Sequence, residues 1–414
     1  MVAIADVGPV GGMSLKRRLA IAERRGKLQA NSLVLPLFLF IIVTFAAPIL
    51  YFLTRTVYDP AIANYLPWTV AALEAWDGKE LPGEEAFAAL VADFKIGQAD
   101  GNVAIVGKRL NYEIDAVRSK IMSSARKVAA IKEGPFKEKL IAIDKIWGQR
   151  LIWVKIKETG ASISDSYVLS VLDRERDVDG NIVKVDERRE IYVTVFERTF
   201  YISLLVTLLT LALGYPVAYV IASAPERIAS LLMILVLVPF WTSLLVRTTA
   251  WYVLLQDSGP INDTLIATGI ASEPWRLVFS RFGTIIAMTH IQLPFTLLPI
   301  YSVMKGISPA YMRAARSLGG GPIYSFMRVY FPLTLPGIGA GCLLTLILSL
   351  GYYITPALVG GPSDQMVSGI IASAMNAENN WGKASALGTV LLIATLILYF
   401  VYNKLVGIDK VKFG

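Results

Sequence analysis

The sequence predicts an all-α membrane domain of six transmembrane helices, with a small α+β domain inserted outside the membrane. Three observations lead to this fold class. Of the 414 residues, 55% are apolar and 17% are charged, whereas an ordinary soluble domain has about 25% charged residues. Six stretches are apolar over the roughly 20 residues that a helix needs to cross a bilayer. Much of the charge lies between Arg55 and Arg198, which indicates one soluble domain set into a membrane protein.

The six apolar stretches should be helical, because lipid cannot satisfy exposed backbone N–H and C=O groups. They cover residues 33–53, 200–222, 230–255, 282–304, 337–359 and 384–406. The first stretch is longer than the apolar core of a signal peptide, and no small-residue cleavage site follows it. We therefore expect it to be retained as a helix.

Basic residues of the two termini and of two short loops fall on one side of the six spans. They are Lys16, Arg17, Arg18, Arg24, Arg25, Lys27, Arg227, Lys305, Arg313, Arg316, Arg328, Lys404, Lys410 and Lys412. Because Lys and Arg gather on the cytoplasmic side of membrane proteins, both termini are expected in the cytoplasm. The same rule explains the net charge of +8 without a nucleic-acid partner.

The spans and loops divide the chain into five parts. These are a cytoplasmic tail at 1–32, the first helix at 33–53, a periplasmic insertion domain at 54–197, a five-helix core at 198–406 with a cytoplasmic loop at 305–336, and a cytoplasmic tail at 407–414. The single cysteine, Cys342, excludes an internal disulfide. The insertion must therefore fold by means of its own hydrophobic core.

The insertion mixes helical and strand patterns. Apolar residues repeat at helical spacing in 117–131 and 136–147, whereas 151–155, 182–185 and 191–195 are predicted as strands. Residues 175–186, ERDVDGNIVKVD, align loosely with a calcium-binding EF loop. Glu at its first position, Asp at its twelfth and the strand-like flanks favour an Asp-Gly hairpin turn instead. No metal site is expected.

Local signals predict two short helices in the cytoplasmic loop. Ser308 is a good N-cap and Pro309 a good first helical residue. The first helix should stop at Gly319, where a left-handed C-cap is accessible, and a second should run from Pro322 to near Pro332. Geometry alone is equally compatible with an ordinary amphipathic connector.

This loop resembles the EAA loop of binding-protein-dependent ABC importer permeases. The family pattern is Glu-Ala-Ala, three residues, Gly, nine residues, Ile, one residue, Leu-Pro. The matching residues here are Arg313, Ala314, Ala315, Gly319, Val329, Phe331 and Pro332. The resemblance implies that Ser308 and these Ala, Gly and Pro residues dock on a separate ATPase subunit. Arg313 stands where the family has Glu, so the charge of this position is reversed.

Two further segments, PFWTSLLVRTTAW at 239–251 and YYITPALVGGP at 352–362, are similar to permeases of the spermidine/putrescine type. The resemblance covers about half the chain, 196–406. It implies a type I ABC importer permease in the inner membrane of a bacterium. Such a permease works with two ATPase subunits, a second related permease subunit and a periplasmic solute-binding protein. ATP and Mg would be bound by the ATPase, since this chain has no phosphate-cradling G-x-x-x-x-G-K-[ST] motif and is not expected to be an enzyme. The subfamily also includes permeases for other organic solutes and for iron, so the resemblance does not identify the solute.

Candidate residues of a translocation path lie in the third and fifth spans. They are Trp241, Arg247, Trp251, Tyr352, Tyr353 and Thr355. An ionisable residue within a span is a functional candidate, and aromatic rings attract amines; a snorkelling Arg and an interfacial aromatic belt are the alternatives. His290 is expected to be packed and hydrogen-bonded. No span has a clear central Asp or Glu, so either the binding protein and partner subunit recognise the solute or the solute is not strongly cationic.

Two other classes of protein remain as alternatives. A membrane-anchored sensor or enzyme would act through the insertion, but no catalytic constellation occurs there, and the tail after Val406 is too short for an output module. An ion channel would need a recognisable filter or a ring of charge. The importer permease is therefore the leading hypothesis.

Overall fold

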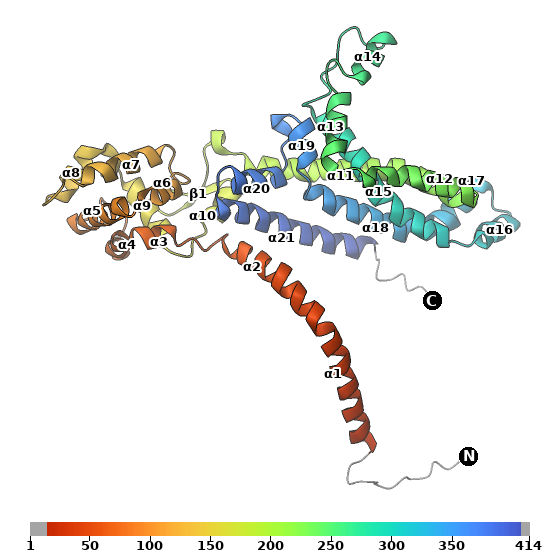
Figure 1. Ribbon diagram of the computed structural model, residues 1–414, viewed down its shortest axis with the longest axis horizontal. Helices are drawn as coiled ribbons and strands as arrows, with labels where there is room; N and C mark the ends of the chain where they lie inside the picture. The colour runs from red at the N-terminus through yellow and green to blue at the C-terminus, as the bar shows by residue number, and fades with distance from the viewer. Residues whose placement is uncertain (1–14, 407–414) are drawn as a thin grey trace. The chain divides into compact units, whose positions relative to one another are not determined.

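The computed structural model describes residues 15–406 (Figure 1). The expected C-terminal tail at 407–414, with Lys410 and Lys412, and the first 14 residues of the N-terminal tail lie outside the described residues. The chain divides into two units, one ending at Thr54 and the other beginning at Arg55.

The first unit is one long helix. It consists of α1 (Leu15–Ile41), the π-turn η1 (Ile42–Ala46) and α2 (Ala47–Thr54). Residues Asn31–Thr54 are long and apolar enough to span a membrane, which confirms the helix expected at 33–53. The wide π-turn lies just before Pro48, whose ring would otherwise clash with the carbonyl four residues earlier.

The second unit holds four further continuous candidate spans and one bent pair among the described residues. The continuous spans are α11 (Tyr192–Ser223), α15 (Arg281–Gly306), Pro322–Leu350 and the part Trp381–Lys404 of α21 (Trp381–Val406). The helical membrane domain predicted from hydropathy is therefore confirmed. The described residues contain five continuous spans, or six if the bent pair counts as one.

The third expected span, 230–255, is not one straight helix. It is built from α12 (Glu226–Leu237), the 3-10 turn η4 (Val238–Trp241) and α13 (Leu244–Leu254), with a bend of 97° between the two arms. Pro239 lacks the N–H that a continuous helix needs. Ser243 then starts α13 as an N-cap, because its Oγ accepts the Val246 N–H at 3.2 Å.

The fifth expected span differs at both ends. Its helix starts outside the predicted 337–359 with α17 (Pro322–Ser325), passes through the π-turn η5 (Phe326–Tyr330) and continues as α18 (Phe331–Leu350). The expectation of a short helix ending near Pro332 is therefore wrong. The wide turn of η5 accommodates the proline ring, as η1 does before Pro48. A break after Leu350 separates α18 from α19 (Ile354–Val359).

Helices α11, α15 and α18 pack closely as the centre of the membrane bundle. Gly337 and Gly341 of α18 face α15 so closely that a Cβ on Gly341 would lie 2.5 Å from the carbonyl oxygen of Thr296. Small residues allow this approach where lipid gives no hydrophobic driving force for association. The remaining elements are α14 (Pro260–Ala267), η6 (Pro362–Asp364) and α20 (Val367–Asn376).

The insertion is mostly helical. Its elements are α3 (Ala61–Tyr65), α4 (Pro67–Glu74), α5 (Glu84–Ala99), α6 (Val103–Leu110), α7 (Val117–Val128), α8 (Phe136–Ile143), η2 (Lys145–Gly148), α9 (Arg150–Gly160), α10 (Ser166–Val171), β1 (Arg174–Arg176), β2 (Ile182–Lys184) and η3 (Glu187–Arg189). The strand at 182–185 and the Asp-Gly hairpin turn are confirmed, with Gly180 at φ +84°. The described part of the insertion thus contains one two-stranded hairpin.

Two predicted strands of the insertion are helical instead. Residues 151–155 lie in α9, where Ile152, Trp153 and Ile156 are buried at three- and four-residue spacing. That period becomes visible only over the whole helix, since a five-residue apolar run fits a strand equally well. Residues 191–195 enter α11, whose first N–H groups are satisfied by Asp173: its carboxylate accepts the N–H of Val193 at 2.8 Å.

The insertion has its own hydrophobic core of aromatic and aliphatic side chains. Phe87, Phe94, Trp147 and Trp153 are buried, with the Phe87 and Trp153 ring centroids 4.5 Å apart. Both indole N–H groups are satisfied: Trp147 donates to Ser124 Oγ and Trp153 to the Trp147 carbonyl, each at 2.9 Å. Within the second unit, the insertion and α16 (Pro309–Ser317) lie at opposite ends (Figure 1).

A candidate coupling surface and translocation cluster

Helix α16 is capped at both ends by the residues that the sequence singles out. Ser308 Oγ accepts the N–H of Ala310 at 3.3 Å, and Pro309 is the first helical residue. At the other end, Gly319 has φ +89°, a left-handed conformation that strongly favours glycine. A Cβ on Gly320 would lie 2.7 Å from Ser325 Oγ. Gly319 is thus required by its backbone conformation, and Gly320 by the close packing around it.

Large apolar side chains of α16, the turn after it, α17 and η5 are exposed. We call this the coupling surface; it consists of Tyr311, Leu318, Ile323, Tyr324 and Met327. Leu318 is 89% and Ile323 78% exposed, and an exposed apolar patch of this kind indicates an interaction site.

The EAA-like residues border the coupling surface. Arg313 and Ala314 are exposed, and Ala315 is half-buried. Pro332 is exposed in the first turn of α18. These residues occupy one continuous segment together with Ser308 and Gly319.

Aromatic packing fixes the coupling surface to the membrane helices. Tyr219 of α11 makes edge-on contacts with Phe326 and Tyr330 of η5, at centroid distances of 5.5 and 5.4 Å. Met312 of α16 packs against the same buried cluster. A displacement of α16 would therefore be carried into α11 and α18, since well-packed side chains transmit strain.

Several predicted path residues come together where α13, α15 and α19 meet. Trp251 Nε1 donates to His290 Nδ1 at 3.1 Å, and the two rings are in edge-on contact. Arg247 lies within electrostatic range of His290 and Tyr352. We call Arg247, Trp251, His290, Tyr352 and Thr355 the translocation cluster. His290 is hydrogen-bonded as expected, but its side chain is exposed rather than packed.

The other path candidates are placed differently. Trp241 is 76% exposed in η4, and Tyr353 is 41% exposed just before α19. Thr355 is fully buried, and its hydroxyl lies 3.1 Å from that of Thr248. Arg247, Trp251 and Thr355 therefore lie together where α13, α15 and α19 meet. Trp241 and Tyr353 lie on the surface of this chain.

A polar seam inside the bundle was not found by sequence reasoning. Thr296 of α15 is hydrogen-bonded to Thr210 of α11 at 2.8 Å and to Thr345 of α18 at 2.6 Å. One turn away, Ser349 donates to the side chain of Gln292. The signal was present as Thr and Ser residues at helical spacing inside apolar spans, where they link neighbouring helices by hydrogen bonds.

Contacts at the start of α21 hold the insertion to the membrane core. Arg109 is ion-paired with Asp59 at 2.7 Å and stacks over the Tyr167 ring at 4.6 Å. Tyr167 packs against Gly382, the second residue of α21, and burial raises the pKa of its phenol. The Thr56 hydroxyl adds a 2.7 Å hydrogen bond to that of Ser385. We call this set of contacts the junction.

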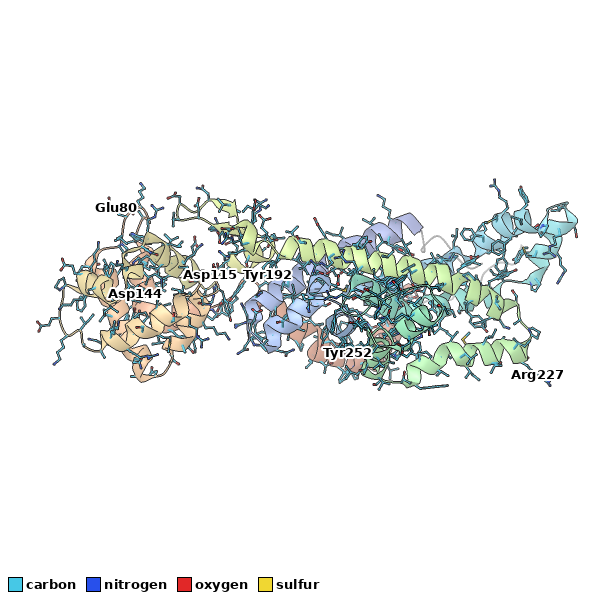
Figure 2. The ribbon with its side chains drawn as sticks, turned by 90° about the horizontal axis from the view of Figure 1, so that it is seen from above. Glu80, Asp115, Asp144, Tyr192, Arg227 and Tyr252 are labelled. Atoms are coloured by element: carbon cyan, nitrogen blue, oxygen red, sulfur yellow. The ribbon has the colours of Figure 1, made fainter. Side chains whose placement is uncertain are left out.

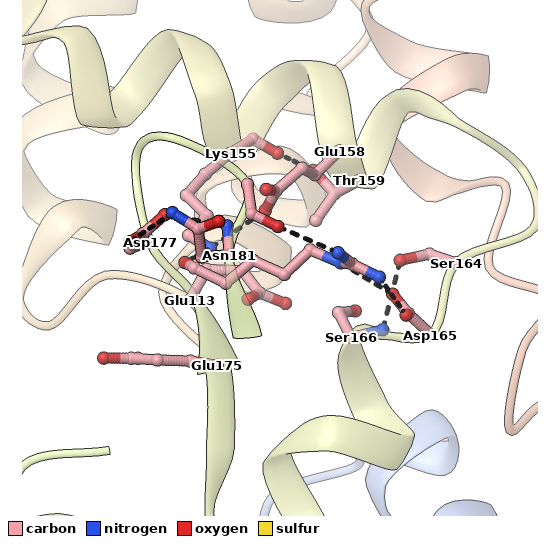
Figure 3. A network of polar contacts seen from close by, with 12 residues as sticks. Glu113, Lys155, Glu158, Thr159, Ser164, Asp165, Ser166, Glu175, Asp177 and Asn181 are labelled. Carbon is pink, nitrogen blue, oxygen red and sulfur yellow. Dashed lines mark hydrogen bonds and ion pairs between the residues drawn. The ribbon is translucent and has the colours of Figure 1, made fainter. Parts of the chain in front are cut away.

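A cavity of about 340 Å³ in the insertion is lined by paired charges (Figure 3). A hydrogen bond from Arg176 lowers the pKa of Asp165. Burial raises the pKa of Glu158, although Lys155 donates to that carboxylate at 2.9 Å. No group of three or more possible metal ligands occurs among residues 15–406. The network stabilises the hairpin and α9 by internal ion pairs.

Comparisons with known proteins identify the membrane core. The family described as "Binding-protein-dependent transport system inner membrane component" matches residues 202–408, half of the chain. The spermidine/putrescine transport system permease protein PotB of Haemophilus influenzae is 36% identical over 220 residues, which cover 52% of this chain and 77% of that protein. The Escherichia coli PotB is 32% identical over 212 residues, covering 51% and 77%.

Two more distant similarities were found. The inner membrane ABC transporter permease protein YdcU of Escherichia coli is 30% identical over 224 residues, 51% of this chain and 70% of that protein. Among solved structures, a bacterial ABC transporter involved in the import of the acidic polysaccharide alginate superposes with a TM-score of 0.45 and 17% identity, covering 54% of this chain and 81% of that one.

The named relatives from Haemophilus influenzae and Escherichia coli are permease proteins of transport systems, so this chain is a transport component rather than an enzyme. Its helical spans and the matched family make it a multi-pass inner-membrane protein. The chain belongs to the family of inner-membrane components of binding-protein-dependent transport systems.

Proposed function

We propose that this permease forms part of the translocation path for a polyamine or a related small organic solute. The proposal rests on its relation to the PotB permeases and on the rings of Trp251 and Tyr352, which suit an amine by cation–π attraction. The spans lack a central carboxylate, and Arg247 adds positive charge to the translocation cluster. Selection of the solute is therefore assigned to the periplasmic binding protein.

The coupling surface carries the mechanistic part of the proposal. A separate ATPase subunit would cover Leu318, Ile323 and their neighbours, and two such subunits would bind ATP and Mg. ATP-driven closure of the ATPase pair would move α16, and the contacts of Tyr219 would pass this movement to α11 and α18. A second, related permease subunit would complete the path, giving alternating access to the two sides of the membrane.

The opposed positions of the insertion and α16 favour a specific orientation. Arg227, in the first turn of α12, lies at the end away from Asp144 of the insertion (Figure 2). Because basic loops stay in the cytoplasm, this arrangement supports a coupling surface in the cytoplasm and an insertion in the periplasm. The basic residues in the sequence near both termini support a cytoplasmic position for the termini as well. The binding protein would then dock on the side of the insertion.

Co-purification tests the coupling surface directly. Leu318→Ser and Ile323→Ser together should remove most of the ATPase that accompanies the permease from membranes, because two exposed apolar anchors are lost. Ile270→Ser is the matched control, since Ile270 is 65% exposed outside the coupling surface. Retention of the ATPase by the double variant at the level of the control would refute this role.

A further inference from the structure

The charge of the insertion is sharply segregated. Residues 116–150, which hold α7, α8 and η2, contain nine Lys and Arg against three Asp and Glu. The rest of the insertion, 55–115 and 151–191, contains 12 basic and 19 acidic residues. Figure 2 shows Asp115, just before this basic stretch, and Asp144, within it, on the insertion. A domain that is close to neutral as a whole therefore has one strongly basic region.

Helix α7 concentrates this charge on its solvent face. Val117, Ile121 and Val128 are fully buried against the domain core. The opposite face carries the exposed side chains of Arg118, Lys120, Arg126 and Lys127, and α7 has no acidic residue. We call these four residues the basic face.

The basic face concentrates unmatched cations on one helix that has no acidic residue. Elsewhere on the insertion, several exposed or half-buried cations are matched: Arg176 with Asp165, Arg189 with Glu175 and Lys184 with Glu190. Others, such as Lys79 and Arg174, have no ion pair within the described residues either, so the density of like charge is what distinguishes α7. Within the described residues, no carboxylate lies within ion-pair distance of the four side chains of the basic face. An ordinary solubilising surface intersperses both signs, whereas unmatched charge of one sign steers an oppositely charged partner.

The insertion is also held rigidly enough to present this face in a fixed position. Lys108 Nζ donates to the Asn379 carbonyl at 3.2 Å, and the Tyr112 hydroxyl to that of Glu378 at 3.4 Å. Together with the junction, these bonds connect α6 to the loop before α21. A surface that is pre-positioned in this way loses less entropy when it binds.

We propose that the basic face docks an acidic surface of the solute-binding protein. This inference rests on the proposed function, which puts the insertion on the side where that protein arrives. The insertion lies outside the family match at 202–408, and PotB is shorter than this chain, since 212 to 220 residues make up 77% of it. The insertion would thus give the permease an additional contact with the binding protein. Because the basic face is positively charged, the complementary surface of the binding protein would be acidic.

The experiment compares two triple variants of the assembled complex in nanodiscs of neutral lipid. Lys120→Gln, Arg126→Gln and Lys127→Gln remove three charges from the basic face. Arg118 is kept because its side chain lies beside Gly107.

The matched control removes three charges elsewhere on the insertion. It combines Lys79→Gln, Arg174→Gln and Arg188→Gln, whose side chains are also exposed. The readout is the concentration of binding protein, loaded with spermidine, that gives half-maximal stimulation of ATP hydrolysis.

For the basic-face variant, this concentration should rise roughly threefold or more in about 0.05 M salt, and the difference from the unaltered complex should shrink in about 0.5 M salt. The control variant should behave like the unaltered complex. Equal effects of the two variants, or no effect of either, would overturn the proposal. A complex that binding protein never stimulates would instead refute the proposed function. If the basic-face variant loses only its binding to anionic vesicles, the occupant is lipid and the proposal fails.

Discussion

Tyr167 and Gly382 are packed so tightly that no other residue fits at position 382. A Cβ on Gly382 would lie 2.2 Å from Tyr167 Cε2 and 2.5 Å from its Cζ. Tyr167 is itself held by a hydrogen bond to Asp59 at 3.1 Å and by the guanidinium of Arg109. The insertion and the N-terminal end of α21 are therefore joined through this contact.

Gly382→Ala should loosen the junction while leaving the insertion core folded. Overpacking of this kind costs about 1–3 kcal/mol, so amides of α10 should exchange with solvent faster in the variant, whereas those of α5 should not. Gly306→Ala is the control, because nothing lies within 4 Å of a Cβ there. Unchanged exchange in α10 would show that the junction adjusts without strain.

Gly341→Ala should impair assembly of the membrane core. The added methyl would meet the Thr296 carbonyl oxygen at 2.5 Å and push α18 away from α15, which weakens the hydrogen bonds of the polar seam. We expect a lower yield of folded permease and a lower unfolding temperature in detergent. Gly351→Ala, with only one atom at 3.9 Å, should change neither, and a normal yield for Gly341→Ala would contradict this packing.

Hydropathy and charge were enough to predict the membrane domain, because both report directly on the solvent around each residue. The capping of α16 by Ser308 and Gly319 was predicted for the same reason: local chemistry decides it. The bend of the third span and the continuation of α17 into α18 were not predicted. Proline indicates a disturbed helix, but surrounding packing decides between a sharp bend after Trp241, shortly past Pro239, and a π-turn before Pro332.

The helix α9 shows why the fold of the insertion was only partly predicted. Its run from Leu151 to Lys155 is apolar enough for a strand. Packing in the core around Trp147 and Trp153 favours a helix instead. Among the site residues, Arg247 was singled out as an ion within a span. Its proximity to His290 depends on the packing of α13 against α15, which no local pattern encodes.

Trp251→Phe should reduce transport without affecting assembly. The variant keeps an aromatic ring but loses the N–H that His290 accepts at 3.1 Å. Loss of one such bond is worth about 0.5–1.5 kcal/mol, so uptake into proteoliposomes should fall roughly twofold to tenfold. Trp275→Phe, at a 51% exposed position, is the control. Equal uptake by the two variants would remove Trp251 from the translocation cluster.

The stability of the insertion should rise when the pH is lowered from neutral. Burial raises the pKa of Asp93 and of Glu158, so the native state binds more protons than the unfolded chain between the usual and the raised pKa of each group. The free energy of unfolding therefore increases as the pH falls through that window.

Two further features of the pH profile follow. Below the usual pKa of Asp, stability should be lost, because Asp165 has a lowered pKa in the folded state and must be protonated against its bond with Arg176. Hydrogen exchange of α9 amides in the complex measures the profile. Glu158→Gln should flatten the rise between the usual and the raised pKa of this group, and an unchanged slope in that variant would show that another group is responsible.

The most direct test of the central claim is the ATPase activity of the co-purified complex in lipid, with and without spermidine-loaded binding protein. If the chain couples solute delivery to a separate ATPase through the coupling surface, loaded binding protein should stimulate hydrolysis several-fold, and Leu318→Ser with Ile323→Ser should abolish the stimulation. If no ATPase co-purifies with the unaltered chain, or if hydrolysis never responds to a loaded binding protein, the account of coupling is contradicted.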